Sequence, residues 1–289
     1  QSNDPVVIMT QTASRTYENQ SNSWPANAQL FLNLSSEGKV KVAVPTYIFP
    51  TVADGVHLTN IVSAWLGEYL SKAARHELFG LGWNPVMPTN VVVSGTNVVI
   101  KYHVPKPPLV FDTTLVSNPG SFGYSLDGAT IGTPTVSGNV VTIPFTSGTP
   151  TRVKYGWNGT LGAADGPTTG QRGNLRDSDT EVGSLTGSNL YNWGLIFNLP
   201  TTAPSTPSGL IAASGNGKIM VSWNRVSDAS FYSLKRALGS GGPYTTIKVT
   251  NGSSFEDTDV APLVTYYYVV TAKGPSGESS QSAEVVGTT

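Results

Sequence analysis

The chain has 289 residues, which is long enough for two or three domains that each bury a core of their own. Its net charge is -1 and 12% of its residues are charged, so it has no basic surface to follow nucleic-acid phosphates, and nucleic acid is not an expected partner. No apolar run reaches the roughly 18 residues needed to span a bilayer, and the absence of cysteine excludes disulfides and thiolate metal sites.

The first predicted element is a strand at residues 5–12, a continuous apolar run typical of sheets that are buried on both faces. A helix is expected near Ala26 to Leu34, and a second strand from Lys39 to Phe49. The order strand, helix, strand is typical of a unit with two parallel strands and a crossover helix. The first strand would then have an unpaired apolar edge.

A short loop and a helix follow the second strand. Apolar residues recur every three or four positions, which is the period of a helix with one buried face, and Thr59 can cap its start. The apolar positions are Leu58, Ile61, Val62, Trp65, Leu66, Tyr69, Leu70 and Ala73. In the loop, Gly55 turns the chain so that Asp54 can reach one ring nitrogen of His57. This is the geometry of a general base oriented by an acid, although the same spacing is more often a helix cap beside a solvated histidine.

The strand, loop and helix together resemble the last catalytic block of the SGNH, or GDSL-type, esterases and lipases. The matching residues are Asp54, His57 and Leu58, and Gly67 and Glu68 continue the pattern in the helix. The resemblance implies a Ser-His-Asp ester hydrolase in which His57 is the general base and Asp54 orients it and stabilises its charged form. It implies no metal and no organic cofactor.

The serine and the oxyanion residues that this resemblance implies cannot be placed in the chain. Gln1-Ser2-Asn3 resembles the nucleophile signature of the sialate O-acetylesterase-like branch, but Ser2 leads directly into a strand, and too few residues separate it from Asp54. We therefore expect residues 1–85 to be the C-terminal portion of a longer esterase. A preceding segment or a companion chain would supply the serine, and the start at Gln1 without a methionine would be processed or truncated.

From Val86 the pattern becomes one of short strands at even spacing, which is typical of a β-sandwich. The run from Asn90 to His103 predicts a hairpin with a glycine-containing turn. The sandwich is expected to extend over residues 86–200. Arg176, Asp177 and Asp179 within it could bind a divalent cation, but a self-satisfied turn is the commoner role for such a cluster.

Aromatic residues mark the second half of this sandwich. The stretches at 155–157, 173–177 and 190–193 resemble the β-sandwich that ends some carbohydrate-directed SGNH esterases. Trp157, Tyr191 and Trp193 could stack on sugar rings, which present an apolar face. The alternative, that they fill the sandwich core, is the commoner role, because aromatic residues more often lie inside a protein.

Residues 201–207 form a proline-rich linker, and residues 208–289 follow the alternating pattern of a seven-stranded sandwich. Trp223 and the run Tyr266-x-Tyr268-x-Val270-x-Ala272 closely resemble the core tryptophan and the sixth strand of a fibronectin type III domain. That resemblance implies a spacer or docking module without chemistry of its own.

The fold class expected from these elements is multidomain. It comprises the C-terminal portion of an α/β SGNH (flavodoxin-like) domain, a β-sandwich and a fibronectin type III β-sandwich. The function expected is that of a secreted carbohydrate esterase that removes O-acetyl groups from a polysaccharide. The alternative is a non-catalytic glycan-binding or adhesion module, because a base and an acid without a nucleophile perform no acyl transfer.

Overall fold

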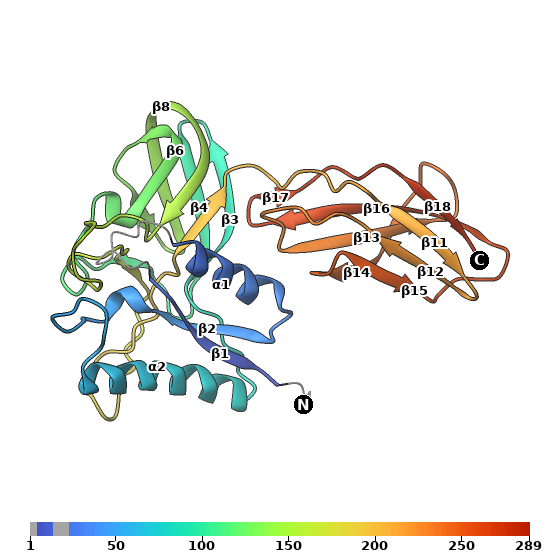
Figure 1. Ribbon diagram of the computed structural model, residues 1–289. Helices are drawn as coiled ribbons and strands as arrows, with labels where there is room; N and C mark the ends of the chain where they lie inside the picture. Colours follow the sequence, from blue (N-terminus) through green and yellow to red (C-terminus); the bar gives the residue numbers. More distant parts are fainter. Residues whose placement is uncertain (1–4, 14–22) are drawn as a thin grey trace. The chain divides into compact units, whose positions relative to one another are not determined.

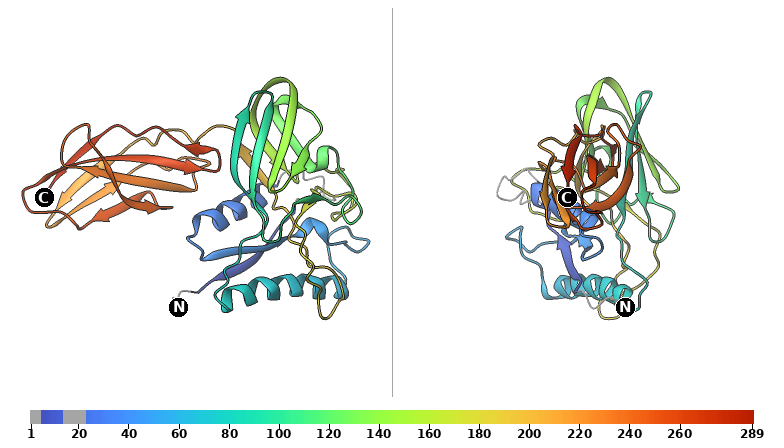
Figure 2. Two further views of the ribbon diagram at one scale, coloured as in Figure 1. Left: turned by 180° about the vertical axis from the view of Figure 1, so that it is seen from behind. Right: turned by 90° about the vertical axis from the view of Figure 1, so that its right-hand side faces the viewer.

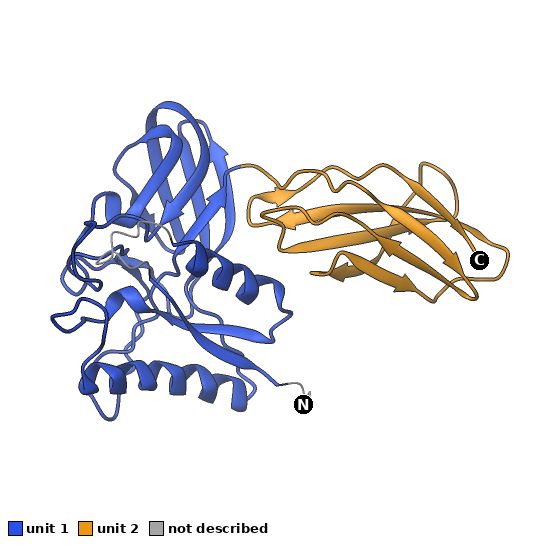
Figure 3. Cartoon of the chain, in the orientation of Figure 1, with its two compact units in different colours: residues 1–201 blue, residues 202–289 orange. Residues whose placement is uncertain are grey.

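A computed structural model describes residues 5–13 and 23–289 of the chain, so Ser2 and the role considered for it lie outside the described residues. The chain forms two compact units, residues 1–201 and 202–289 (Figure 3). The division falls within the predicted proline-rich linker. Thr201 belongs to unit 1, where its backbone N–H and its hydroxyl donate to the carbonyl oxygens of Thr151 and Pro150.

Unit 1 begins with a two-stranded parallel sheet and two helices. These elements are β1 (Val7–Gln11), α1 (Trp24–Ser35), β2 (Val40–Pro45), a short 3-10 helix (Thr46–Ile48) and α2 (Asn60–Leu78). Val7 lies opposite Val40 and Met9 opposite Val42, which confirms the expected parallel pairing. The two helices lie on opposite faces of the sheet (Figure 1). Covering both faces explains why the two strands read as continuous apolar runs.

Helix α2 forms where the period of three and four residues predicts it. Thr59 adopts an extended backbone and its side chain accepts a hydrogen bond from the N–H of Val62, so it caps the first turn. Arg75 and His76 occupy the last turn, where positive charge favours the negative end of the helix dipole. None of the described helices is both long and apolar enough to cross a membrane.

The rest of unit 1 is a β-sandwich. Its strands are β3 (Met87–Ser94), β4 (Asn97–His103), β5 (Val110–Phe111), β6 (Tyr124–Ile131), β7 (Thr135–Ser137), β8 (Val140–Tyr155), β9 (Leu175–Arg176) and β10 (Phe197–Pro200). The first part of β8 pairs with β4 and β7, and its last part pairs with β6 and β10. Gly148 lies in the part that pairs with β6, opposite Ala129, and a side chain there would collide with the Gly128 carbonyl. One strand therefore joins the two layers.

The sandwich is confirmed, and the molecule is mostly β-sheet with few helices. An α/β SGNH domain is not shown. Within residues 5–13 and 23–85, the structure has only the two-stranded β1–β2 sheet, which is too small to stand as an independent sheet. Its interior is also continuous with the sandwich, because Leu30 and Val42 share one buried cluster with Val98 and Ile100. The N-terminal elements thus extend the sandwich core.

Unit 2 has two sheets. Its strands are β11 (Ile211–Gly215), β12 (Lys218–Ser222), β13 (Phe231–Ala237), β14 (Thr245–Thr250), β15 (Ser254–Asp257), β16 (Thr265–Gly274), β17 (Gly277–Glu278) and β18 (Val285–Thr288). The sheet β11-β12-β15 faces the sheet β14-β13-β16-β18, and β17 pairs with the end of β16. Trp223, Tyr268 and Val270 are buried between them. This three-on-four sandwich confirms a fibronectin type III-like domain.

Candidate functional site

The turn before α2 carries the expected acid and base. The N–H of Gly55 donates to the Val52 carbonyl at 2.9 Å, and the N–H of Val52 donates to the His57 carbonyl at 2.8 Å. Gly55 has a φ of 74°, in the left-handed region that glycine enters without steric cost. The turn is therefore closed on itself by backbone bonds before the helix begins.

Asp54 and His57 are brought together by this turn. One carboxylate oxygen of Asp54 accepts the N–H groups of Val56 and His57, both at 2.9 Å, and the other lies 2.8 Å from Nδ1 of His57. The N–H bonds from His57 and Val56, followed by the bond to the His57 ring, lower the pKa of Asp54 to about 2. An ionised Asp54 orients the imidazole so that Nδ1 donates and Nε2 is left for another partner.

The pair is open to solvent and has no described nucleophile. The His57 side chain is 80% exposed and that of Asp54 is 48% exposed. Within residues 5–13 and 23–289, the carboxylate of Asp54 is the sole side chain that bonds the His57 ring. The arrangement can take up and release a proton at Nε2, but without a nucleophile it forms no acyl intermediate.

A second loop joins this turn to the start of α1. The N–H of Asp165 donates to the Gly55 carbonyl, and the Thr51 hydroxyl donates to the Asp165 carbonyl, both at 3.0 Å. At the other end of the loop, the Gln171 side chain donates to the Trp157 carbonyl at 2.6 Å. The loop of residues 157–171 therefore begins at Trp157 and reaches the Asp54–His57 turn.

Two tryptophans meet at the base of that loop. Trp24 begins α1 and lies edge-on to Trp157, with 6.1 Å between the ring centroids and 81° between the planes. Trp24 is 57% exposed, and Trp157 is half-buried. Sequence reasoning missed Trp24 because it looked for the buried face of a helix starting at Ala26. Pro25 offered a signal, since proline favours the first helical positions and so moves the start of α1 back to Trp24.

The other two aromatic candidates are placed differently. The guanidinium carbon of Arg176 lies 3.7 Å from the ring centroid of Tyr191, so this cation covers one face of the ring. Trp193 is 2% exposed and packs in the core beside α2. Of the three sugar-stacking candidates, Trp157 is the one whose ring contacts the exposed ring of Trp24.

The acidic cluster at 176–179 is satisfied by the protein itself. Arg176 donates to Asp112 at 2.7 Å, and Asp177 accepts the Asn192 side chain at 2.6 Å. Burial raises the pKa of Asp177. Burial is the largest single influence on Asp179 and opposes its ionisation. The hydrogen bond from Lys72, 2.7 Å long, acts with the Glu181 N–H, the Lys72 charge and the Asn192 side chain, and together they lower the pKa of Asp179. The cluster fastens α2 to the sandwich.

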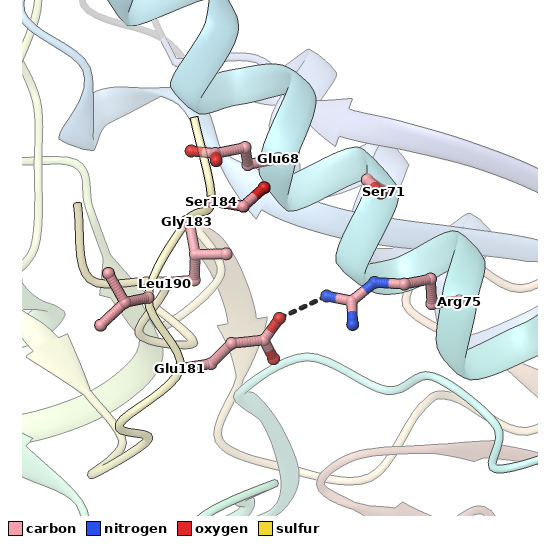
Figure 4. Close-up of a pocket in the computed structure, with 8 residues that line it drawn as sticks. Glu68, Ser71, Arg75, Glu181, Gly183, Ser184 and Leu190 are labelled. Atoms are coloured by element: carbon pink, nitrogen blue, oxygen red, sulfur yellow. Dashed lines mark hydrogen bonds and ion pairs between the residues drawn. The ribbon is translucent and has the colours of Figure 1, made fainter. Parts of the chain in front are cut away.

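A pocket of about 580 Å³ lies beside this cluster, between α2 and residues 181–190 (Figure 4). An ion pair between Arg75 and Glu181 crosses it. Glu68, part of the family-like pattern in the sequence, accepts the N–H of Leu185 at 2.6 Å and the hydroxyl of Thr186 at 2.5 Å. The charged groups of this pocket are thus engaged with each other, and Glu68 serves to anchor a loop.

Comparison with known proteins identifies relatives of part of the chain. No protein-family model matches it. An amylopullulanase of Thermoanaerobacterium saccharolyticum is 38% identical over 81 residues, which is 28% of this chain and 6% of that protein. An amylopullulanase of Thermoanaerobacter thermohydrosulfuricus is 41% identical over 108 residues, 36% of this chain and 7% of that protein. The chain thus spans less than a tenth of the length of these relatives.

The solved structures that are similar to part of the chain include fibronectin type III-like proteins. A Fn3-like protein from Clostridium thermocellum is 36% identical, covers 30% of this chain and 90% of its own, and has a TM-score of 0.27. The FN3tt structure is 22% identical, covers 30% of this chain and 97% of its own, with the same score. The fold of unit 2 itself is defined by its strand order and its core.

The prediction of a Ser-His-Asp carbohydrate esterase is wrong. The curated relatives are named amylopullulanases, none of them an esterase, and each match covers a short part of the chain. The pair Asp54 and His57 forms as expected, but spacing and a hydrogen bond define only an oriented imidazole. An Asp and a His at this spacing also meet in turns that have no catalytic role, so the local geometry did not justify the enzyme class.

Proposed function

We propose that this chain is a non-catalytic, glycan-binding part of a secreted polysaccharide-acting protein. The single observation that carries the proposal is the edge-on pair formed by the exposed Trp24 and the half-buried Trp157. The relatives also support a non-catalytic part, because each matched region is a small fraction of an amylopullulanase, as expected for an accessory segment.

The tryptophan pair has the properties of a sugar platform. Indole rings present large apolar faces and have few rotatable bonds, so they bind with little loss of conformational entropy. Trp24 keeps more than half of its surface in water, although burying such a ring would be favourable by about 25 cal/mol per Å² of apolar surface. A sugar ring laid against it would remove that surface from water.

Polar contacts in this proposal come from the neighbouring turn. The loop that begins at Trp157 reaches Gly55, and the exposed Nε2 of His57 is oriented by Asp54. An oriented imidazole can exchange hydrogen bonds with sugar hydroxyls without any bond being broken. Asp54 and His57 are thus proposed as a binding group, and the fibronectin type III-like unit as a spacer.

Affinity electrophoresis of the full chain tests the proposal. Pullulan and amylopectin are the probes, chosen from the names of the relatives, with dextran and xylan run beside them. We expect retardation in at least one glycan, and about tenfold weaker binding for Trp24→Ala and for Trp157→Ala, equivalent to about 1.4 kcal/mol. Tryptophan fluorescence should change on binding in the wild-type chain.

The matched control is Phe79→Ala, which removes an exposed aromatic ring at the far end of α2. Its binding should equal that of the wild-type chain. Absence of retardation in all four glycans, or equal losses in Phe79→Ala and Trp24→Ala, would refute the proposal.

A further inference from the structure

The two edges of the β1–β2 sheet are treated differently by the protein. On the outer edge of β2, side chains satisfy the backbone. Ser36 accepts the N–H of Val40, and Asn33 accepts the N–H of Val42, both at 2.8 Å. The indole of Trp83 donates to the Val42 carbonyl at 2.8 Å. With its donors and acceptor occupied, this edge is closed to a further strand.

In the described part of the chain, the outer edge of β1 has no such partners. The N–H of Val7 donates to the Lys39 carbonyl at 2.8 Å, which sets the alternation of the parallel ladder. Val7 and Met9 therefore direct their backbone groups to β2, and Ile8 and Thr10 direct theirs outward. No residue within 5–13 and 23–289 hydrogen-bonds the outward groups of Ile8 or Thr10.

This open edge also lacks the usual protection. Natural edge strands carry a lysine, a proline or an inward-pointing charge, which prevents unwanted pairing with other strands. The segment Val-Val-Ile-Met-Thr at 6–10 contains none of these. Val7 is 53% exposed. The last turn of α2 lies beside the start of β1 (Figures 1 and 2). Leu78 ends this helix and Phe79 follows it, and each is 75% exposed. An apolar surface thus adjoins unpaired backbone groups.

The far end of the edge is capped. The N–H of Thr12 donates to the Gln29 side chain at 2.8 Å, and Gln11 is held by the Ala26 and Ile196 backbones. The open edge therefore runs from an apolar start to a polar, closed end. A second copy related by a two-fold axis would pair β1 antiparallel to itself and place the apolar start against the closed end. A parallel segment would keep apolar residues beside apolar residues.

We propose that the outer edge of β1 binds an extended, apolar, uncharged segment of a companion polypeptide. This segment adds a third parallel strand, its backbone pairs with Ile8 and Thr10, and its first side chains cover Val7 and the end of α2. The helices on both faces of the β1–β2 sheet favour the parallel direction, because parallel strands are those that need both faces covered.

Amide hydrogen exchange of the full chain, followed by NMR, tests this. The probe is a synthetic peptide with the core Val-Val-Ile-Met-Thr between lysine tails. In the free chain, the amides of Ile8 and Thr10 should exchange at least about 100-fold faster than that of Met9, because they have no acceptor. With about 1 mM peptide, their exchange should slow at least tenfold, and Met9 should be unchanged.

Variants separate edge pairing from other binding. Ile8→Pro removes an outward N–H and leaves the donors to β2 in place. Val7→Lys adds a charge at an exposed position, so it serves as the second variant if the proline variant does not fold. Both should abolish the protection. Leu185→Lys, at another exposed apolar position, should retain it.

Three results would overturn the proposal. The first is slow exchange of Ile8 and Thr10 in the free monomer. The second is unchanged exchange with about 1 mM peptide. The third is protection that rises with protein concentration alone, together with a dimer in sedimentation, which would identify a second copy as the occupant.

Discussion

Two hydrogen-bonded acid–base pairs, one just before helix α2 and one within it, have nearly the same length and opposite surroundings. Asp54 and His57, 2.8 Å apart, stand in water just before the helix begins. Lys72 and Asp179, 2.7 Å apart, are buried where the helix meets the sandwich. Lys72 also donates to the Leu190 carbonyl at 2.5 Å, and Asp179 also accepts the N–H of Glu181 at 3.0 Å.

The comparison shows that distance alone does not rank such pairs. Water screens the exposed pair and hydrates either partner when the other is removed, so little folding free energy depends on it. The buried pair has lost its hydration, and removing one partner leaves an uncompensated charge. The exposed pair is therefore free to serve binding, and the buried pair serves the union of α2 with the sandwich.

The largest expected effect is that of Lys72→Ala. The substitution leaves the Asp179 carboxylate and the Leu190 carbonyl without their buried donor, so unit 1 should lose about 3–5 kcal/mol of unfolding free energy. Urea unfolding of the full chain at pH 7, followed by tryptophan fluorescence, measures it. The transition of unit 2 should not move, because no described residue of that unit takes part.

His57→Ala is the matched control, since it removes the imidazole partner of Asp54 in the exposed pair. Its unfolding transition should coincide with that of the wild-type chain. Comparable destabilisation in His57→Ala and Lys72→Ala would contradict the contrast between the two pairs.

An intermediate effect is expected for Glu68→Ala. Burial disfavours its charged form, but donors on residues 185 and 186 outweigh this and lower the pKa of Glu68. Unlike the buried pair, this carboxylate faces a loop that can reach water once released, so the cost should be about 1–3 kcal/mol. Faster amide exchange at Leu185 and Thr186 would confirm the loss of the anchor.

The sign of the pH dependence of Glu68 follows from its lowered pKa. Its contribution to stability is complete above the unfolded value of about 4.3 and is lost as the pH falls through the lower folded value. Glu68→Ala should therefore lose this part of the acid sensitivity. A variant with the wild-type acid profile and unchanged exchange would show that the loop is held by other contacts.

Much of the fold follows from the sequence where the signal is local. The period of three and four residues, together with the Thr59 cap, defines α2. A turn at Gly55, with the N–H groups of Val56 and His57 as donors to the carboxylate, brings Asp54 to His57. In unit 2, the alternation around Tyr268 and the buried Trp223 identify the domain. Each of these features depends on neighbours within a few positions.

The features that sequence reasoning did not find depend on contacts between distant residues. The Gln11 side chain donates to the Ile196 carbonyl, and Asn27 accepts the N–H of Asn198, so the N-terminal elements join the sandwich. No periodicity encodes such pairings. The pairing of Trp24 with Trp157 is of the same kind, because it joins the start of α1 to a residue far along the chain.

The smallest effect concerns the exposed pair itself. Asp54 should titrate with a midpoint of about 2 instead of its ordinary 3.8, and the His57 amide should follow the same curve. Its modest contribution to stability is present above the ordinary value and lost as the pH falls through about 2. Carboxyl carbon NMR measures the midpoint. In His57→Ala the two backbone donors remain, and they include the largest cause of the shift, so the midpoint should rise only part of the way toward 3.8. A full return would assign the shift to the ring, and the turn would then not be what holds the carboxylate.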